Sequence, residues 1–431
     1  MGNIAVKQRN DRVVITGMGM VSPLGIGLLP SWQRMLAGES ARGPISAFDA
    51  AGFPTCVAAE VGSFDPRPFV SDRKLLKYTH KSSTFALGAA QMAFQDSGLA
   101  MGQVADDRLG VYIGSGVTGL EAGDFFTAFD LSVQDGQLNF QTYGREGIRR
   151  VNPTFLLNSL SNNGLCFISI FMQARGPNNN MVKSGTASGQ AIGEGFKVLQ
   201  RGDADVMIVG GYDSLVTISA FLQYSSVGLL TTRQVCRPFD RRRDGFMPGE
   251  GAGILILERL EHAFGRGARV YAEMVGYGCS CDAYHVLNVP PNGEGLQGAM
   301  RAALHDAQMA PEEVDYIIAH GNATIQGDRS ETAAIKSVLG ELAWHVPITS
   351  LKPMIGHLGA ASDAVELQAG VLAMQAGVVL PTLNYESPDP ACDLDYVVNG
   401  PRPHSVNAFL CLSRSVGGQN AALAVRRFKD E

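Results

Sequence analysis

Short apolar runs alternate with longer amphipathic stretches along most of the chain. The runs at 12–19, 111–113 and 205–211 hold consecutive apolar residues and lead into glycine, which is typical of buried parallel strands. Residues 30–38 and 81–97 instead repeat their apolar positions at helical spacing. The first part of the chain therefore predicts strands and helices in alternation, which is the pattern of an α/β fold.

The same alternation restarts at about residue 259. A loop and then a strand are predicted over 236–258, and the next strand falls at 270–276. We divide the chain into two α/β halves, 12–258 and 259–427. The remaining predicted elements are a buried helix at 154–175, helices at 295–309, 330–340 and 360–376, strands at 315–321 and 346–350, and a terminal hairpin at 407–427.

The stretch 176–202 stands out because an extended approach meets a Ser-Gly turn and then a helix. Thr186 and Ser188 are candidates to cap the start of that helix. Backbone N–H groups and the positive helix end gather at such a turn, where they lower a thiol pKa or hold an anion. The turn is therefore the predicted centre of the chemistry.

Composition narrows the possible partners. Of 431 residues 45% are apolar and 18% are charged, so the chain buries a sizeable core, and its formal charge of −6 gives no case for nucleic acid or an anionic membrane. Seven scattered cysteines are typical of a reducing cytoplasm. Cys279 and Cys281 have no second pair for a metal, and no apolar run reaches the ~18 residues of a membrane span. We expect a cytoplasmic protein without a metal site.

A glycine motif favours a different class of protein. Residues 114–119 match G-x-G-x-x-G after a strand, which would suggest a nicotinamide-dependent oxidoreductase. That motif needs a following helix, a second strand and an acidic residue about 20 positions later. A phenylalanine-rich segment and a polar stretch to residue 150 follow instead, so this alternative is the weaker one.

Two histidines lie at turns of the kind where parallel α/β sheets place their catalytic and binding groups. His320 follows a predicted strand, and His357 ends a Lys-x-x-x-Gly-His segment that starts at Lys352. Taken alone, each histidine is more often structural than catalytic.

These segments together resemble the β-ketoacyl-ACP synthases, the condensing enzymes of fatty-acid and polyketide synthesis. The matches are the turn after Gly176-Pro177, the segment 236–258, and the His-Gly and Lys-x-x-x-Gly-His segments. The resemblance covers about 12–427 and implies an α/β, thiolase-like fold: two duplicated α/β halves in a layered αβαβα arrangement. It also places the catalytic cysteine of the family at residue 185, which is glycine here.

The resemblance implies roles for the remaining site residues. In such enzymes the two histidines bind the malonyl thioester carbonyl and stabilise the enolate, so His320, His357 and the matching Lys352 are candidate catalytic residues. Asp328, Glu331 and Glu366 match the acidic partners, the last two as structural groups. Asn322 replaces the first threonine of the family motif, a small departure beside His320.

The departures from the family are as informative as the matches. Val416 replaces the phenylalanine that gates the acyl pocket, and the backbone N–H groups of Gly185 and Val416 are the candidate oxyanion donors. Ser184 stands one residue before the nucleophile position and is expected to point elsewhere. No side chain is then left to hold an acyl group covalently.

Within the superfamily, a chain without the cysteine looks like a chain-length factor, the ketosynthase β-subunit of a type II polyketide synthase. The resemblance implies a heterodimer with a cysteine-containing ketosynthase α-subunit, served by an acyl carrier protein with phosphopantetheine-linked acyl groups and no cofactor bound to this chain. One alternative is a malonyl-ACP decarboxylase that uses the histidine pair. Another is a non-catalytic scaffold.

Two surface assignments complete the expectations. Phe125, Phe126 and Phe129 are the candidate tunnel floor that limits chain length, and ordinary interface core is the competing interpretation. A basic cluster of Arg73, Lys74 and Lys77, together with Arg233, is the candidate carrier-protein contact. A solvated helix face is the alternative for the cluster.

Overall fold

The computed structural model describes residues 12–116 and 123–430. Its centre is an eleven-stranded sheet whose strands follow the order β13-β12-β16-β17-β11-β1-β10-β9-β5-β8, with the short β2 paired to β1. The first-half strands are β1 Val13–Ser22, β2 Gly25–Ile26, β5 Leu109–Ser115, β8 Asn178–Val182, β9 Val206–Ser214 and β10 Glu250–Arg259. The second-half strands are β11 Ala272–Cys281, β12 Tyr316–Ile318, β13 Ile348–Thr349, β16 Ala408–Arg414 and β17 Gln419–Arg426.

The two halves of the sheet repeat one pairing pattern. From β8, the pairings run parallel to β5 and β9, then antiparallel to β10 and β1. From β13, they run parallel to β12 and β16, then antiparallel to β17 and β11. The halves meet where β1 pairs with β11. This repeat is the thiolase-like α/β fold that the resemblance implied.

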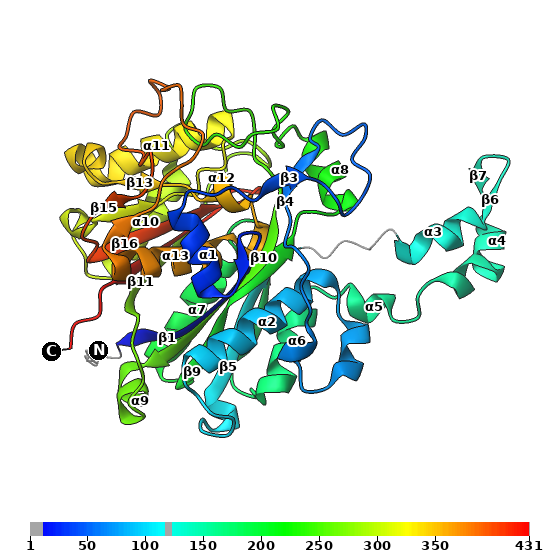
Figure 1. Ribbon diagram of the computed structural model, residues 1–431, viewed down its shortest axis with the longest axis horizontal. Helices are drawn as coiled ribbons and strands as arrows, with labels where there is room; N and C mark the ends of the chain where they lie inside the picture. The colour runs from blue at the N-terminus through cyan, green and yellow to red at the C-terminus, as the bar shows by residue number, and fades with distance from the viewer. Residues whose placement is uncertain (1–11, 117–122, 431) are drawn as a thin grey trace, which may run out of the picture.

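Helices cover and divide the sheet, as Figure 1 shows. The main ones are α2 Lys81–Asp96 and α6 Asn163–Met172 on the first half, α10 Glu294–Asp306 and α11 Ile325–Leu339 on the second, and α7 Ala187–Arg201 and α13 Ser362–Ala376 between them. α7 packs on β9 and β5, while α13 contacts β10, β16 and α7. Because α7 and α13 have sheet on both sides, they are buried almost all round.

Glycine allows the outer helices to approach the sheet closely. A Cβ atom on Gly19 in β1 would lie 2.0 Å from the Ala89 carbonyl oxygen of α2. The smaller elements are α1 Leu28–Leu36, β3 Arg42–Pro44, β4 Val57–Ala59, α8 Ile218–Ser226, α9 Leu260–Gly265, α12 Lys352–Ile355, β14 Val378–Val379, β15 Arg402–Pro403, and the 3₁₀ turns η1 Arg67–Phe69, η2 Arg73–Tyr78, η3 Asp106–Arg108, η5 Pro311–Glu313, η6 Gly340–Trp344 and η7 Gly359–Ala361.

The buried helix predicted at 154–175 is wrong in its first part. The structure has α5 Phe155–Asn158, a break, and then α6, and Leu156, Leu157 and Leu160 are exposed. The apolar leucines misled the prediction because their burial depends on what packs against them, not on the local pattern.

The capping prediction at the start of α7 also fails. Thr186 occupies the N-cap position, but its side chain makes no capping hydrogen bond. The Ser188 hydroxyl instead accepts a hydrogen bond from the Ala364 amide of α13 at 3.2 Å. Tertiary contacts between the two central helices therefore replace local capping here.

A projecting segment extends from the body of the molecule between residues 123 and 160 (Figure 1). We call it the arm; it contains α3 Gly123–Asp130, the hairpin β6 Val133–Gln134 and β7 Gln137–Leu138, α4 Phe140–Arg145, η4 Gly147–Arg150 and α5. Its surface is rich in exposed large apolar side chains: Phe126, Phe129, Leu131, Val133, Phe140, Ile148, Leu156, Leu157 and Leu160.

Two searches of the described residues bear on membrane and metal binding. No helix within 12–116 and 123–430 has the length and apolar content needed to cross a bilayer. In the same part of the chain, no group of three or more His, Cys, Asp or Glu side chains is placed to hold a metal ion.

Candidate functional site

Three turns from different parts of the chain converge on one buried point. Gly185 lies between β8 and α7, His320 follows β12, and His357 follows α12. A methyl group placed on Gly185 would lie 3.4 Å from the Cε1 atom of His320 and 3.4 Å from that of His357. The two histidine rings are nearly perpendicular, with centroids 5.3 Å apart. The structure therefore brings together the three residues that the sequence singled out.

His357 is a neutral hydrogen-bond donor in this arrangement. Its Nδ1 atom accepts a hydrogen bond from the Gly359 amide at 3.0 Å, so in the neutral ring the proton is inferred to be on Nε2. Burial, together with the nearby Lys352 ammonium, lowers the pKa of His357 well below its usual value. The ring can donate to a carbonyl oxygen without carrying a charge.

His320 is held by its backbone. The amides of His320 and Gly321 donate to the two carboxylate oxygens of Glu331 at 2.7 and 2.8 Å. Burial, the Lys352 ammonium and His357 lower the pKa of His320 well below its usual value, so this ring is neutral as well. Its Nδ1 has no hydrogen-bond partner among the described residues. Glu331 thus positions His320, as its expected structural role implied.

Lys352 lies beneath the histidines as half of a buried ion pair. Its Nζ donates to Glu366 Oε1 at 2.8 Å, and neither side chain is more than 1% exposed. Burial opposes the Lys352 charge, but the Glu366 carboxylate raises the pKa of Lys352 above its usual value. This retained positive charge helps to keep both histidines neutral.

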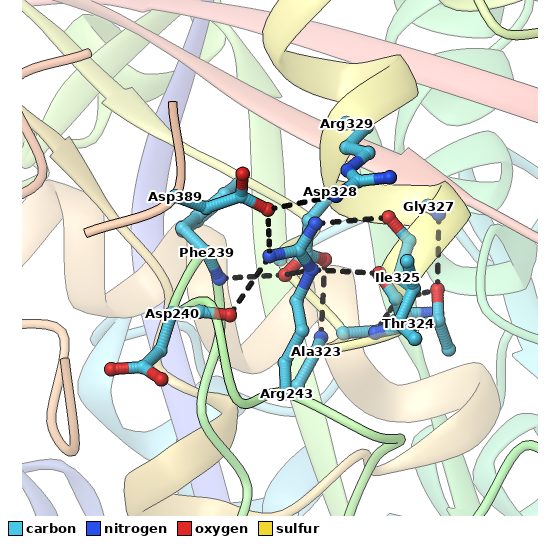
Figure 2. Close-up of polar contacts among 12 residues, drawn as sticks. Phe239, Asp240, Arg243, Ala323, Thr324, Ile325, Gly327, Asp328, Arg329 and Asp389 are labelled. Carbon is cyan, nitrogen blue, oxygen red and sulfur yellow. Dashed lines mark hydrogen bonds and ion pairs between the residues drawn. The ribbon is translucent and has the colours of Figure 1, made fainter. Parts of the chain in front are cut away.

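Arg243 fixes the loop that follows His320, as Figure 2 shows. Its guanidinium donates to Asp389 Oδ2 at 2.8 Å, to the Thr324 carbonyl at 3.3 Å and to the Ile325 carbonyl at 3.0 Å. Asp328 lies 3.5 Å from the same guanidinium. Because these contacts are buried, the loop has little freedom to change shape. The sequence did not single out Arg243; its place in the 236–258 segment was the only signal.

The two halves of the chain interlock around the central helices through two acids that the sequence also missed. Asp363 of α13 accepts a hydrogen bond from the Gly189 amide of α7 at 2.8 Å. Reciprocally, Asp213 at the end of β9 accepts from the Ala360 amide at 2.9 Å. Burial raises the pKa of Asp213 to about 6. For Asp363, burial and then the Glu366 carboxylate raise the pKa to about 8. These contacts hold the Gly185 and His357 turns in register.

The end of β16, where the chain turns toward β17, closes the site next to Gly185. Arg414 is buried, and its guanidinium contacts Asn420 at 3.1 Å, Ser330 at 2.9 Å and Asp282 at 3.3 Å. Its carbonyl oxygen lies 2.5 Å from the position of a Cβ on Gly185. Any side chain at residue 185 would therefore require this turn to move.

A pocket of about 280 Å³ opens beside the histidines. Val416, 41% exposed, stands at its wall next to Ser415. Ser184 was expected to point elsewhere, but it also lines this pocket. The other lining residues are Tyr224, Val227, Gly228, Leu229, Asp244, Phe246, Leu287, Asn288, Val289, His320, Asn322, Thr324, Ile325, Gln326, Gly327, His357 and Arg414.

The candidate tunnel residues lie away from this pocket within the chain. Phe125 packs edge-on against Phe155 with centroids 5.2 Å apart, and Phe129 stacks on Tyr143 at 5.6 Å. Phe125, Phe129 and Phe126, which is 58% exposed, belong to α3 of the arm, whereas Tyr143 belongs to α4 and Phe155 to α5. Their proposed role in chain length stays a prediction.

The candidate carrier contacts fall in two places. Arg73, Lys74 and Lys77 are exposed on η2. Arg233 is exposed beside the pocket, where its amide donates to the pocket-lining Asp244 at 3.0 Å. The glycine motif at 114–119 lies partly outside the described residues, which include only Gly114 to Gly116 of it.

Comparison with known proteins places this chain in a family. Residues 10–263 match the β-ketoacyl synthase N-terminal domain, and residues 271–386 match the C-terminal domain. The chain belongs to the β-ketoacyl synthase family. Among curated proteins, the 3-oxoacyl-[acyl-carrier-protein] synthase 2 of Coxiella burnetii is 39% identical over 424 residues, which is 97% of this chain and 99% of the relative. The enzyme of the same name from Synechocystis sp. is 39% identical over 423 residues, or 97% of this chain and 98% of that one.

Solved structures of this family show the same fold. The ishigamide ketosynthase/chain length factor superposes with a TM-score of 0.88 at 32% identity, covering 97% of this chain and 100% of that one. A type II polyketide ketosynthase in complex with its acyl-carrier protein superposes with a TM-score of 0.82 at 32% identity, with the same coverage. The proteins similar to this chain thus include 3-oxoacyl-[acyl-carrier-protein] synthases and a type II polyketide ketosynthase.

Proposed function

We propose that this chain is a chain-length factor, the subunit that pairs with a cysteine-containing ketosynthase in a type II polyketide synthase. The observation that carries the proposal is Gly185 beside two neutral histidines. The residue at the predicted nucleophile position has no side chain, and the Arg414 carbonyl occupies the space that a Cβ would need. The site keeps groups that polarise a carbonyl and has none there that forms a thioester.

The arm supports the proposed pairing with a second chain. Monomeric proteins rarely expose so many large apolar side chains on one projecting segment. The strand β8 is one edge of the sheet, and Val182 within it is 43% exposed. An exposed edge strand is a second ready site for another chain. In the proposed dimer, Phe125, Phe126 and Phe129 of the arm bound the partner's growing polyketide.

The proposed substrates and carrier contacts follow from the likeness to the ketosynthases. The chain would act with an acyl carrier protein that presents phosphopantetheine-linked acyl groups, and would need no cofactor of its own. Arg233 is the better placed of the candidate carrier contacts because it adjoins Asp244 at the pocket. The cluster of Arg73, Lys74 and Lys77 stays a candidate by exposure and charge alone.

Native mass spectrometry tests the proposal most directly. The chain is expressed alone and together with the cysteine-containing ketosynthase encoded beside it, and we expect a stable one-to-one heterodimer. Phe126→Glu and Leu156→Glu place a charge on the apolar arm and should weaken the heterodimer at least tenfold. Met101→Glu, which changes an exposed apolar residue outside the arm, is the matched control. A homodimer that ignores the ketosynthase would overturn the proposal.

A second candidate function is decarboxylation of malonyl-ACP by this chain itself. It is favoured by the neutral histidine pair, because loss of CO₂ needs hydrogen-bond donors for the enolate and no thiol. Release of CO₂ by the isolated chain, abolished in both His320→Ala and His357→Ala, would support it. CO₂ release equal to that of the variants would remove it.

A further inference from the structure

A pair of hydroxyl groups lies in the pocket directly beside Gly185. The Ser184 Oγ atom and the Tyr224 phenol oxygen are 3.0 Å apart, and both residues line the pocket with the two histidines. Ser184 precedes Gly185 in the turn, whereas Tyr224 comes from α8. Neither residue belongs to the set of catalytic candidates considered above.

Tyr224 is held in a fixed position by packing. Its ring meets the Phe246 ring edge-on with centroids 5.3 Å apart, and Phe246 in turn lies 4.9 Å from the His357 ring. Burial raises the pKa of Tyr224, so the phenol stays protonated at neutral pH. The pair and His357 are therefore joined by one packed wall of the pocket.

The pair has one hydrogen-bond donor to spare. Two hydroxyl groups carry two protons, and the hydrogen bond between Ser184 and Tyr224 uses one of them. Within the described residues, neither hydroxyl oxygen makes a second hydrogen bond, so the other proton is available to a molecule in the pocket. A ligand with an oxygen at this point satisfies that donor, whereas a hydrocarbon leaves it unpaired.

The place of the pair beside the histidines suggests which ligand oxygen is involved. Ser184 directly precedes Gly185, whose Cβ position lies 3.4 Å from both histidine rings, and consecutive Cα atoms are only about 3.8 Å apart. Ser184, Tyr224 and the two histidines also line one pocket. If the histidines hold a thioester carbonyl, we expect the hydroxyl pair to meet an oxygen carried two carbons farther along the acyl group. We propose that Ser184 and Tyr224 bind the oxygen on the third carbon of a thioester-linked acyl group. This oxygen belongs either to the carboxylate of a malonyl group or to the keto group of a 3-ketoacyl group.

The inference rests on the proposed function only in assuming that acyl thioesters enter this pocket. Beyond that assumption, the inference says which acyl groups the pocket prefers, because the hydroxyl pair distinguishes oxygenated acyl groups from saturated ones. Saturated chains, which carry no oxygen on the third carbon, are the disfavoured class.

Calorimetric titration of the full chain with three ligands tests this selection. The ligands are amide analogues of malonyl-, acetoacetyl- and butyryl-phosphopantetheine, in which nitrogen replaces the thioester sulfur so that the malonyl group keeps its CO₂. We expect at least one of the first two to bind roughly threefold to tenfold more tightly than butyryl, the range of one hydrogen bond. The tighter of the two identifies the source of the oxygen.

Variants assign the preference to the hydroxyl pair. Ser184→Ala and Tyr224→Phe should each reduce the preference over butyryl while changing butyryl binding itself less than twofold. Ser226→Ala is the matched control, because Ser226 is an exposed serine on the same helix that does not line the pocket. Equal affinity of the wild-type chain for all three ligands, or a full preference in both pair variants, would overturn the inference.

This outcome is separable from that of the proposed function. The pair lies in the pocket and not on the arm, so Ser184→Ala and Tyr224→Phe should still form the heterodimer in native mass spectrometry. If the chain prefers oxygenated ligands but does not bind the ketosynthase, only the chain-length-factor proposal is contradicted. If the heterodimer forms but its pocket shows no preference, only the hydroxyl-pair inference is contradicted.

Discussion

The two sides of the pocket differ in how their functional groups are held. On the side built from the second half, Glu331 fixes the His320 turn, Gly359 sets the tautomer of His357, and Lys352 is paired with Glu366. On the side built from the first half, Gly185 presents only backbone. The chain therefore keeps a preorganised site for polarising a carbonyl while the opposite side offers nothing at residue 185 for covalent attachment.

The side of the pocket that carries Gly185 is nevertheless tightly packed. The Arg414 carbonyl fills the space next to Gly185, and a buried guanidinium with three side-chain partners anchors that turn. Gly185 and the Arg414 carbonyl that lies against it thus form one packed arrangement. Substitutions on the two sides of the pocket should therefore lower the free energy of unfolding by different amounts. Three measurements test this expectation.

The largest effect is expected where the histidine side is broken. Lys352→Ala leaves Glu366 buried without its partner, so the free energy of unfolding should fall by about 3–5 kcal/mol. Urea denaturation measures this change. The double variant Lys352→Met/Glu366→Met removes both charges and should lose much less. A Lys352→Ala protein within about 1 kcal/mol of the wild type would show that the ion pair does not hold this side together.

A smaller effect is expected on the glycine side. Gly185→Ala places a Cβ 2.5 Å from the Arg414 carbonyl oxygen, so the turn must shift, at a cost of about 1–3 kcal/mol in unfolding free energy. Gly62→Ala is the matched control, because an added Cβ there meets nothing within 4 Å and its φ is not positive. Thermal unfolding of the two variants side by side measures the difference. Equal melting temperatures would mean that the turn is free to move away.

The smallest effect, taken per pH unit, concerns the contact that joins the two sides. Burial raises the pKa of Asp213 from 3.8 to about 6, so between these values the folded protein holds a proton that the unfolded chain has released. Stability should therefore fall as the pH rises from about 4 to about 6, by at most about 1.4 kcal/mol per pH unit from this group.

Asp213→Asn cannot titrate and serves as the test of this slope. Subtracting its unfolding free energy from that of the wild type at each pH removes the contribution of the other buried acids. The difference should change steadily between about pH 4 and 6 and then level off. A difference that is flat across this range would show that Asp213 stays ionised and that its contact with Ala360 is a charged one.

Much of the fold was predictable because it depends on local pattern. Buried strands such as β1 and β9 and long helices such as α2 and α13 fall within a few residues of their predicted ranges. The prediction failed at 154–175, where the leucines of α5 face outward on the arm. Apolar character alone does not say whether a residue is covered by its own chain or is left for another.

By itself, the sequence determined the order of the elements, the glycine at residue 185 and the two histidine turns, because each is a matter of residue type and spacing. Only the tertiary structure decided what surrounds them. The Arg414 carbonyl against Gly185, the Ser184–Tyr224 pair and the contacts of Asp213 with Ala360 and of Asp363 with Gly189 all join residues 40 to 229 positions apart. Contacts at such separations arise from the packing of whole layers, which no local pattern in the chain encodes.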